Sequence, residues 1–434
     1  MNAICRYTCT VIFVIVLSTS GIIALACTTQ AQAPPPTPDP TVNIETTAEA
    51  MVRAASPTAT PALSPVIDVV PTPSPTSVPP TAPPALTAAP TPIPTLMPVP
   101  TNTPMPPMPR GVVDPAIEVT VYDPQRAWPG TTLLSDRHDT DKPRIIEVNM
   151  LGEVIWEYFL PEDFHRTDTM GPDAEELSNK NILLVLPKQG VIEINRNGDV
   201  VWSHMDEKVT HDADRLPNGN ILYGFGDDTI EDAQVKEVSP KGEVIWAWYA
   251  KEHFNRQPYM SMSDEHGWTT TNSVERLENG NTLLSLKNFG VVVEVDPNGS
   301  TVRTVGEGLL IKPHGPELLP NGNIRVVNHS KHHELIEFDP SNNEIVWRFL
   351  PPYNKLGMAL GIGKEKSRKV MLPIRDADTL PNGNVLFTAY GIIFEVTRDG
   401  DIVWQLQFSD FHSALDGWKS TGFYKAERIG LDAP

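Results

Sequence analysis

Cysteine is nearly absent from this chain of 434 residues: Cys5, Cys9 and Cys27 are the only three, and all lie within the first 27 residues. The rest of the chain therefore has no disulfide, no thiol nucleophile and no cysteine-based metal site. Basic residues are also scarce, because 34 Lys and Arg stand against 54 Asp and Glu, a formal net charge of −20. This acidic balance argues against nucleic acid as a partner.

Residues 1–27 have the pattern of an export signal. Arg6 is the only early positive charge, and the apolar run Val11–Leu17 is short for a membrane-spanning helix. The end of the segment, Ile23-Ala24-Leu25-Ala26-Cys27, resembles a bacterial lipoprotein cleavage site. We therefore predict a lipoprotein-type signal peptide with Cys27 as the lipidated residue; the alternative is an uncleaved N-terminal anchor. Both alternatives predict that the chain is exported and tethered. We expect it to be lipid-anchored at the cell membrane, or at the cell surface or in the periplasm.

Residues 28–112 are predicted to be a disordered linker. The stretch from Ala31 to Pro109 contains 24 of the chain's 44 prolines, together with many Thr, Ala and Ser and few charges. Such a composition cannot bury a core and favours a polyproline-II-like tether. The folded domain is expected to occupy residues 117–434, which are enough to build a sizeable core.

A phrase of ten residues, eleven in one copy, recurs six times in this domain. Each copy begins with Glu and an apolar alternation, continues through a turn rich in Gly, Asn, Asp and Pro, and usually ends in Trp, a pattern that predicts a β-hairpin. The copies are EVNMLGEVIW from Glu147, EINRNGDVVW from Glu193, EVSPKGEVIW from Glu237, EVDPNGSTVR from Glu294, EFDPSNNEIVW from Glu337 and EVTRDGDIVW from Glu395.

A second phrase alternates with the first and also reads as strand, turn, strand. Its copies are PDAEELSNKNIL from Pro172, HDADRLPNGNIL from His211, NSVERLENGNTL from Asn272, HGPELLPNGNIR from His314 and RDADTLPNGNVL from Arg375. Each period thus holds four strands, which is one blade of a β-propeller. Only half of this phrase precedes the first hairpin, at Pro129, and Tyr424–Ile429 matches the missing half. We predict an all-β, six-bladed β-propeller closed by a C-terminal strand.

The first residue of each inner strand is expected to point toward the axial channel at one face of the ring. Perfect repetition would place the same residue type there six times. Instead the set contains two imidazoles, a guanidinium, an amide and a phenol, which suits anion binding and nucleophilic or acid–base chemistry. These residues are Pro172, His211, Asn272, His314, Arg375 and Tyr424. Lys287, the aromatic Trp268 and a basic loop from about Pro351 to Ile374 are expected at the same face.

Structural explanations remain open for these residues. His211 and His314 could be hydrogen-bonded channel residues without catalysis, Arg375 could pair with Asp376 or Asp378, and Lys287 could be a solvated loop lysine. His329, His332 and His333 lack carboxylates at a fitting spacing, so we predict a solvated loop there and no metal site.

The domain resembles the bacterial arylsulfate sulfotransferase family, whose members are exported six-bladed propellers. The resemblance rests on the HDxxxLPNGN unit, on the Glu-to-Asn-Gly hairpins and on GWTTTNSVERLENGNTLLSLKN. It implies that His314 is the transiently sulfated histidine, that His211 is a second active-site histidine and that Asn272 binds substrate. The family histidine two residues before that asparagine is Thr270 here. The family arginine of the following turn is Lys287, or is displaced to another position.

The resemblance implies an enzyme that moves a sulfuryl group from an aryl sulfate to a phenol through a sulfohistidine intermediate. Substrate-binding positions would be Asn272, Thr270, Lys287, Arg375, Tyr424 and Trp268. No cofactor, metal or nucleotide sulfate donor is expected. The alternative function is a non-catalytic, surface-tethered propeller that binds a glycan, a peptide or a partner protein.

Overall fold

A computed structural model describes residues 108–139, 141–165, 171–226, 229–264, 267–352, 374–389, 391–409 and 423–431. The predicted signal peptide, Cys27 and nearly all of the predicted linker lie outside these residues, as does most of the basic loop from Pro351. The described residues are β-strands with four short 3-10 helices, η1 (Glu162–Phe164), η2 (Ala250–Glu252), η3 (Tyr259–Ser261) and η4 (Lys287–Phe289). No helix among them is long and apolar enough to cross a membrane.

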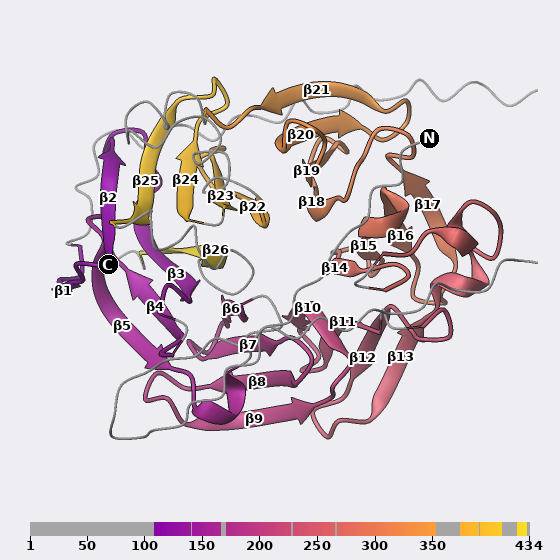
Figure 1. Cartoon of the computed structure of the whole chain (residues 1–434), viewed down its shortest axis with the longest axis horizontal. Helices are drawn as coiled ribbons and strands as arrows, with labels where there is room; N and C mark the ends of the chain where they lie inside the picture. Colours follow the sequence, from indigo (N-terminus) through magenta and orange to yellow (C-terminus); the bar gives the residue numbers. More distant parts are fainter. Residues whose placement is uncertain are drawn as a thin grey trace, which may run out of the picture. The chain divides into compact units, whose positions relative to one another are not determined.

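Six antiparallel sheets form a ring, and each sheet is one blade (Figure 1). Blades 2 to 5 have four strands each, in sequence order from the axis outward. Blade 2 consists of β6 (Asp173–Glu176), β7 (Ile182–Leu186), β8 (Gly190–Ile194) and β9 (Val200–Met205). Blade 3 consists of β10 (Val209–Arg215), β11 (Ile221–Phe225), β12 (Val235–Val238) and β13 (Val244–Trp248). Blade 4 consists of β14 (Thr271–Arg276), β15 (Thr282–Leu286), β16 (Val291–Val295) and β17 (Thr301–Val305). Blade 5 consists of β18 (His314–Leu318), β19 (Ile324–Asn328), β20 (Glu334–Asp339) and β21 (Glu344–Phe349).

Blades 1 and 6 close the ring and have five strands each. In blade 1 the C-terminal strand β26 (Phe423–Gly430) is innermost and pairs with β3, which confirms the predicted closure. The other strands of blade 1 are β3 (Gly130–Asp136), β4 (Arg144–Val148), β5 (Glu153–Phe159) and β1 (Val112–Val113). Blade 6 consists of β22 (Asp376–Thr379), β23 (Val385–Ala389), β24 (Ile392–Val396), β25 (Ile402–Phe408) and β2 (Ile117–Tyr122).

The two outermost strands were not predicted. β1 pairs with β5 and β2 pairs with β25, so the N-terminal residues of the domain cover the outer edges of the first and the last blade. Strand pairing begins at Val112, inside the predicted linker. An edge strand exposes unpaired N–H and C=O groups, and covering two of these edges protects them.

One buried glutamate joins the two repeated phrases in each of blades 2 to 6. In blade 3 Asn220 Nδ2 donates to Glu237 Oε1 at 2.6 Å, and Arg276 of blade 4 pairs with the second oxygen at 2.9 Å. The asparagine-to-glutamate bond recurs from Asn181, Asn281, Asn323 and Asn384 to Glu193, Glu294, Glu337 and Glu395. The repeated Glu and Asn are therefore structural, because each links turns that lie far from the candidate site.

We call the contact surface between two neighbouring blades a seam. Apolar side chains of facing sheets fill the seams, as Trp248 and Val235 do with Leu284 across the seam between blades 3 and 4. The Trp that ends a hairpin phrase also crosses the seam and donates its Nε1 to a backbone carbonyl of the next hairpin. This bond runs from Trp156, Trp202, Trp347 and Trp404 to Arg196, Pro240, Arg398 and Met150.

Candidate active site

β-Bulges at the start of the inner strands shape the axial channel. The pairing register shifts between Val209 and Ala213 in β10, and β14, β18 and β26 are irregular at the corresponding place. A bulge interrupts the strict alternation of side chains, so the side chains of consecutive residues can point to the same face of the sheet. In β18 the bulge contains Gly315 at φ +49°, and a Cβ there would lie 2.5 Å from Asp376 Oδ1 of blade 6. Only glycine fits at this position.

His314 is the first residue of β18 and is 7% exposed. Its Nδ1 lies 2.9 Å from the carbonyl oxygen of Lys312. A carbonyl only accepts, so Nδ1 carries the proton and Nε2 keeps its lone pair. Burial, with further contributions from His329 and Arg375, lowers the pKa of His314 well below its usual value. His314 is therefore neutral near pH 7, with a free lone pair on Nε2.

His329 packs directly on His314, which the sequence did not predict. The two rings are stacked with centroids 4.2 Å apart, and His329 Nε2 donates to the Ile374 carbonyl at 2.7 Å. Burial lowers the pKa of His329 to about 3, so it is neutral as well. The prediction of a solvated loop is wrong for His329, whereas the side chain of His332 is exposed.

His211 lies in β10 beside Tyr424 of β26, with ring centroids 6.1 Å apart. Its Nδ1 is buried without a hydrogen-bond partner. Burial lowers the pKa of His211 to about 3, and the nearby charges of Arg375, Lys425 and Lys287 act in the same direction. Tyr424 is 6% exposed, and burial raises its pKa.

Two predicted cations influence both histidines. Arg375 and Lys287 each lower the pKa of His211 and of His314, which places both charges within electrostatic reach of both rings. Lys287 begins η4 and is 8% exposed, and its Nζ pairs with Asp264 at 3.2 Å. The alternative of a solvated loop lysine is therefore wrong. Arg375 immediately precedes β22, and its backbone N–H donates to the Thr388 carbonyl at 2.7 Å.

The remaining predicted substrate-binding residues differ in their surroundings. Asn272 is 6% exposed, and its Nδ2 is a buried donor without a partner. Thr270 has a left-handed backbone at φ +49°, and its Oγ1 accepts from Asn288 Nδ2 at 3.1 Å. Trp268 is buried, packs against Phe289 and donates to the Tyr259 carbonyl at 2.8 Å. These contacts indicate that the Trp268 ring packs against its protein neighbours, and none of them supports a contact with substrate.

Sequence reasoning missed a ring of carboxyl groups in the channel. The fourth residue of each inner-strand phrase is acidic in all six blades, and this repetition was the available signal. These residues are Glu175, Asp214, Glu275, Glu317, Asp378 and Glu427. Burial raises the pKa of Asp214, Glu275 and Glu427 to about 7 in each case. Repulsion from neighbouring carboxylates adds to the effect, so these groups lie within electrostatic reach of other acidic side chains.

One lysine offsets part of this negative charge. Lys425 Nζ contacts Asp173 Oδ2 and Asp212 Oδ1, both at 2.6 Å. Within the described residues, no group of three or more His, Cys, Asp or Glu side chains is arranged to hold a metal ion. Because its Nζ contacts both carboxylates, Lys425 supplies a positive charge inside an otherwise acidic part of the channel.

The sheet order and the closing strand define a six-bladed β-propeller. Residues 120–304 match the model of the arylsulfotransferase (ASST) family, so the resemblance inferred from the sequence is confirmed over this part of the chain. The matched segment contains His211, Thr270, Asn272 and Lys287, whereas His314 and Arg375 lie beyond its end. No curated protein matches the chain.

Several solved structures resemble the chain. A Bacteroides caccae protein of unknown function is 20% identical with a TM-score of 0.46, covering 69% of this chain and 99% of that one. A catalytically inactive virginiamycin B lyase from Staphylococcus aureus, solved with quinupristin, is 12% identical with a TM-score of 0.41, covering 66% and 86%. BamB from Moraxella catarrhalis is 12% identical with a TM-score of 0.34, covering 66% and 76%. No function follows from these similarities.

Proposed function

We propose that this protein is a nucleotide-independent aryl sulfotransferase that transfers a sulfuryl group from an aryl sulfate to a phenol through a sulfohistidine on His314. The observation that carries the proposal is the state of His314. It is buried and neutral, its Nδ1–H is held by the Lys312 carbonyl, and its Nε2 keeps the lone pair. A nucleophilic imidazole needs this combination.

The surroundings of His314 supply both charge and hydrogen bonds for a sulfuryl group. Lys287 and Arg375 provide positive charge that offsets the charge on the sulfuryl oxygens. His211 Nδ1 and Asn272 Nδ2 are buried nitrogens without partners. A buried polar atom without a hydrogen bond costs about 1–3 kcal/mol, so a bound sulfuryl oxygen would relieve this cost at Asn272.

The reaction proceeds in two displacements. His314 Nε2 attacks the sulfur of the donor, the S–O bond to the aryl group breaks, and the phenolate leaves with the electron pair. The oxygen of the acceptor phenol then attacks the sulfur, and the S–N bond breaks with its electron pair returning to Nε2. Over the full cycle the proton lost by the acceptor is gained by the released phenolate, and the kinetics are ping-pong.

The proposal is tested with p-nitrophenyl sulfate as donor and phenol as acceptor. We expect release of p-nitrophenol and, without acceptor, a sulfuryl mass increase on the peptide containing His314. His314→Ala should abolish both signals. His204→Ala is the matched control, because His204 lies in the outer strand β9 and contacts Tyr223. Equal release by wild type and His314→Ala would refute the assignment.

A non-catalytic propeller remains the second candidate function. The observation in its favour is Thr270, whose hydroxyl bonds to Asn288 where the family has a histidine. If wild type releases no p-nitrophenol while the folded protein is intact, the ring is a binding scaffold and its histidines are structural.

We further propose that the protein is exported and anchored to the membrane by a lipid on Cys27. The support is the signal-like pattern of residues 1–27 and the proline-rich stretch that follows. Incorporation of labelled palmitate into wild type, and its loss in Cys27→Ser, is the expected result. Unchanged labelling in Cys27→Ser would contradict the anchor.

A further inference from the structure

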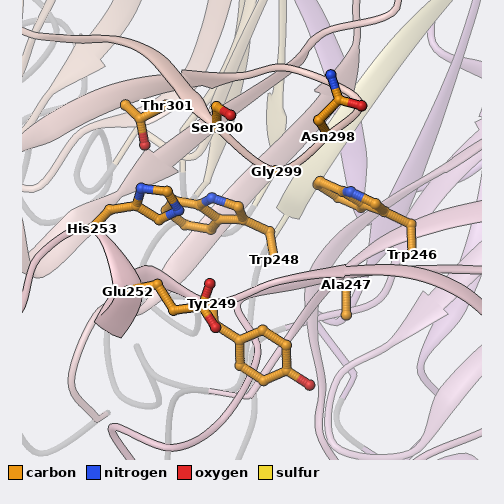
Figure 2. Close-up of a pocket in the computed structure, with 10 residues that line it drawn as sticks. All are labelled: Trp246, Ala247, Trp248, Tyr249, Glu252, His253, Asn298, Gly299, Ser300 and Thr301. Atoms are coloured by element: carbon orange, nitrogen blue, oxygen red, sulfur yellow. The ribbon is translucent and has the colours of Figure 1, made fainter.

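A cavity of about 610 Å³ lies at the seam between blades 3 and 4, away from the axial channel (Figure 2). One wall comes from the outer strand β13 and from η2, and the other comes from the turn between β16 and β17. The lining residues are Trp246, Ala247, Trp248, Tyr249, Glu252, His253, Asn298, Gly299, Ser300 and Thr301. Its volume falls within the range of small-molecule sites.

The cavity exists because two repeated contacts are missing at this seam. Trp246 occupies the position from which four other tryptophans donate to the next hairpin, but within the described residues it forms no such bond. Its ring instead lies against the Arg276 guanidinium, whose Cζ is 5.6 Å from the ring centroid. At this seam the tryptophan therefore does not tie the outer strand to the next blade.

The second missing contact involves the residue two positions after the tryptophan. At other seams this residue packs on the glycine of the next hairpin turn. A Cβ at Gly198 or Gly242 would lie 3.2 Å from Tyr158 or His204, respectively. A Cβ at Gly299 would meet no atom within 4 Å. The hairpin turn of blade 4 thus stands clear of Trp248, and the space between them is the cavity.

Two polar atoms of the wall are buried without hydrogen-bond partners. They are Nε1 of Trp248, whose side chain is 2% exposed, and Oγ1 of Thr301. Figure 2 shows the indole nitrogen on the side that faces Ser300 and Thr301. Because leaving such atoms unpaired costs about 1–3 kcal/mol each, they favour a ligand that offers both a donor and an acceptor.

The chemistry of the wall selects among ligands. No Lys or Arg is among the lining residues, and Glu252 is acidic, so an anion would find no counter-charge. Trp246 and Trp248 supply aromatic surface, and Asn298, Ser300 and Thr301 supply neutral polar groups. We propose that this cavity binds a neutral sugar, whose C–H face packs on an aromatic ring while its hydroxyl groups pair with Trp248 Nε1 and Thr301 Oγ1.

The ligand reaches these two atoms by displacing a rim side chain. His253 stacks on Trp248 with ring centroids 5.3 Å apart and an interplanar angle of 16°. When the imidazole turns aside, the part of the indole that it covers becomes accessible. Binding should therefore change the fluorescence of the protein as well as release heat. The inference is independent of the proposed sulfotransferase activity.

The test uses the full chain and a panel of neutral probes: glucose, galactose, mannose, N-acetylglucosamine and their disaccharides. Saturation-transfer NMR identifies binding, and calorimetry measures Kd. We expect at least one probe to bind, Thr301→Val to weaken that binding about fivefold through the lost hydrogen bond, and Trp246→Ala to weaken it further. Thr304→Val is the matched control, because Thr304 lies on the same strand, is exposed and does not line the cavity.

Two results would overturn the proposal. The first is that no probe in the panel binds. The second is that a probe binds equally to wild type, Thr301→Val and Trp246→Ala, which would place the sugar elsewhere on the protein. Urea unfolding of each variant checks that it is folded, and Thr301→Val alone suffices if Trp246→Ala does not fold.

Discussion

Replacing one channel carboxyl group should make the propeller more stable in mild alkali. Glu275 lies in β14, where burial, together with the nearby Glu317 and Asp212 carboxylates, raises its pKa to about 7. In the unfolded chain the same group has a pKa of 4.5. The folded state therefore binds the Glu275 proton more tightly than the unfolded chain does. The stability that this protonation contributes is fully present below about pH 4.5 and is lost as pH rises through about 7.

The size of the effect follows from the two pKa values. The interval from 4.5 to about 7, at about 1.4 kcal/mol for each pH unit, corresponds to about 3 kcal/mol. Glu275→Gln keeps the shape of the side chain but stays neutral at every pH. We expect the variant to be nearly as stable as wild type at about pH 5 and up to about 3 kcal/mol more stable at about pH 9.

Urea unfolding followed by tryptophan fluorescence at both pH values measures the difference. Glu278→Gln is the control, because Glu278 is exposed in the turn between β14 and β15 and should gain nothing at either pH. The reasoning fails if Glu275→Gln has the same pH profile as wild type. It fails equally if the variant gains as much at about pH 5 as at about pH 9, since the gain would then come from packing and not from charge.

Three further predictions concern the site and the ring. His329→Ala should lower kcat about tenfold or more with little change in KM, because the stacked ring orients His314 without contacting substrate; steady-state kinetics separate the two constants. Lys425→Met should destabilise the fold by about 3–5 kcal/mol in urea unfolding, because it removes the ammonium group that contacts both Asp173 and Asp212 inside the channel. Removing residues 423–434 should abolish the cooperative unfolding transition in calorimetry, because blade 1 loses its innermost strand β26.

The architecture could be predicted because the repeat specifies it locally. Each blade consists mainly of two hairpins, and consecutive residues of the sequence specify the turns, the apolar alternation and the glutamate of these hairpins. The closing strand was also predictable, since Tyr424–Ile429 repeats the inner-strand pattern and lacks a partner within its own period. β1 and β2 were not predicted, because neither strand contains a repeated phrase. Their positions depend only on pairing with the outer strands β5 and β25.

The candidate site was harder to predict because it depends on departures from the repeat. The bulges in β10, β14, β18 and β26 change which side chains point to the axis, and no residue pattern in the sequence predicts where the bulges occur. His329 lies in a loop whose sequence reads as solvated, yet the fold places it on His314. The carboxyl ring, in contrast, was visible in the fourth position of every inner-strand phrase and could have been found by aligning the six copies.

The channel carboxyl groups also explain why a site for an anion is compatible with so acidic an axis. The inner strands of neighbouring blades belong to different sheets, so the backbone N–H groups on their axis-facing edges lack a β-ladder partner. Carboxylates take that place: Asp212 and Asp214 accept from Val274 N and Arg276 N at 2.8 and 3.3 Å, and Glu427 accepts from Glu176 N at 2.7 Å. The ring of negative charge thus serves closure of the propeller. Under the proposed function, an aryl sulfate would be repelled from this part of the channel, so its binding at His314 would depend on the local positive charge of Lys287 and Arg375 and not on the field of the whole protein.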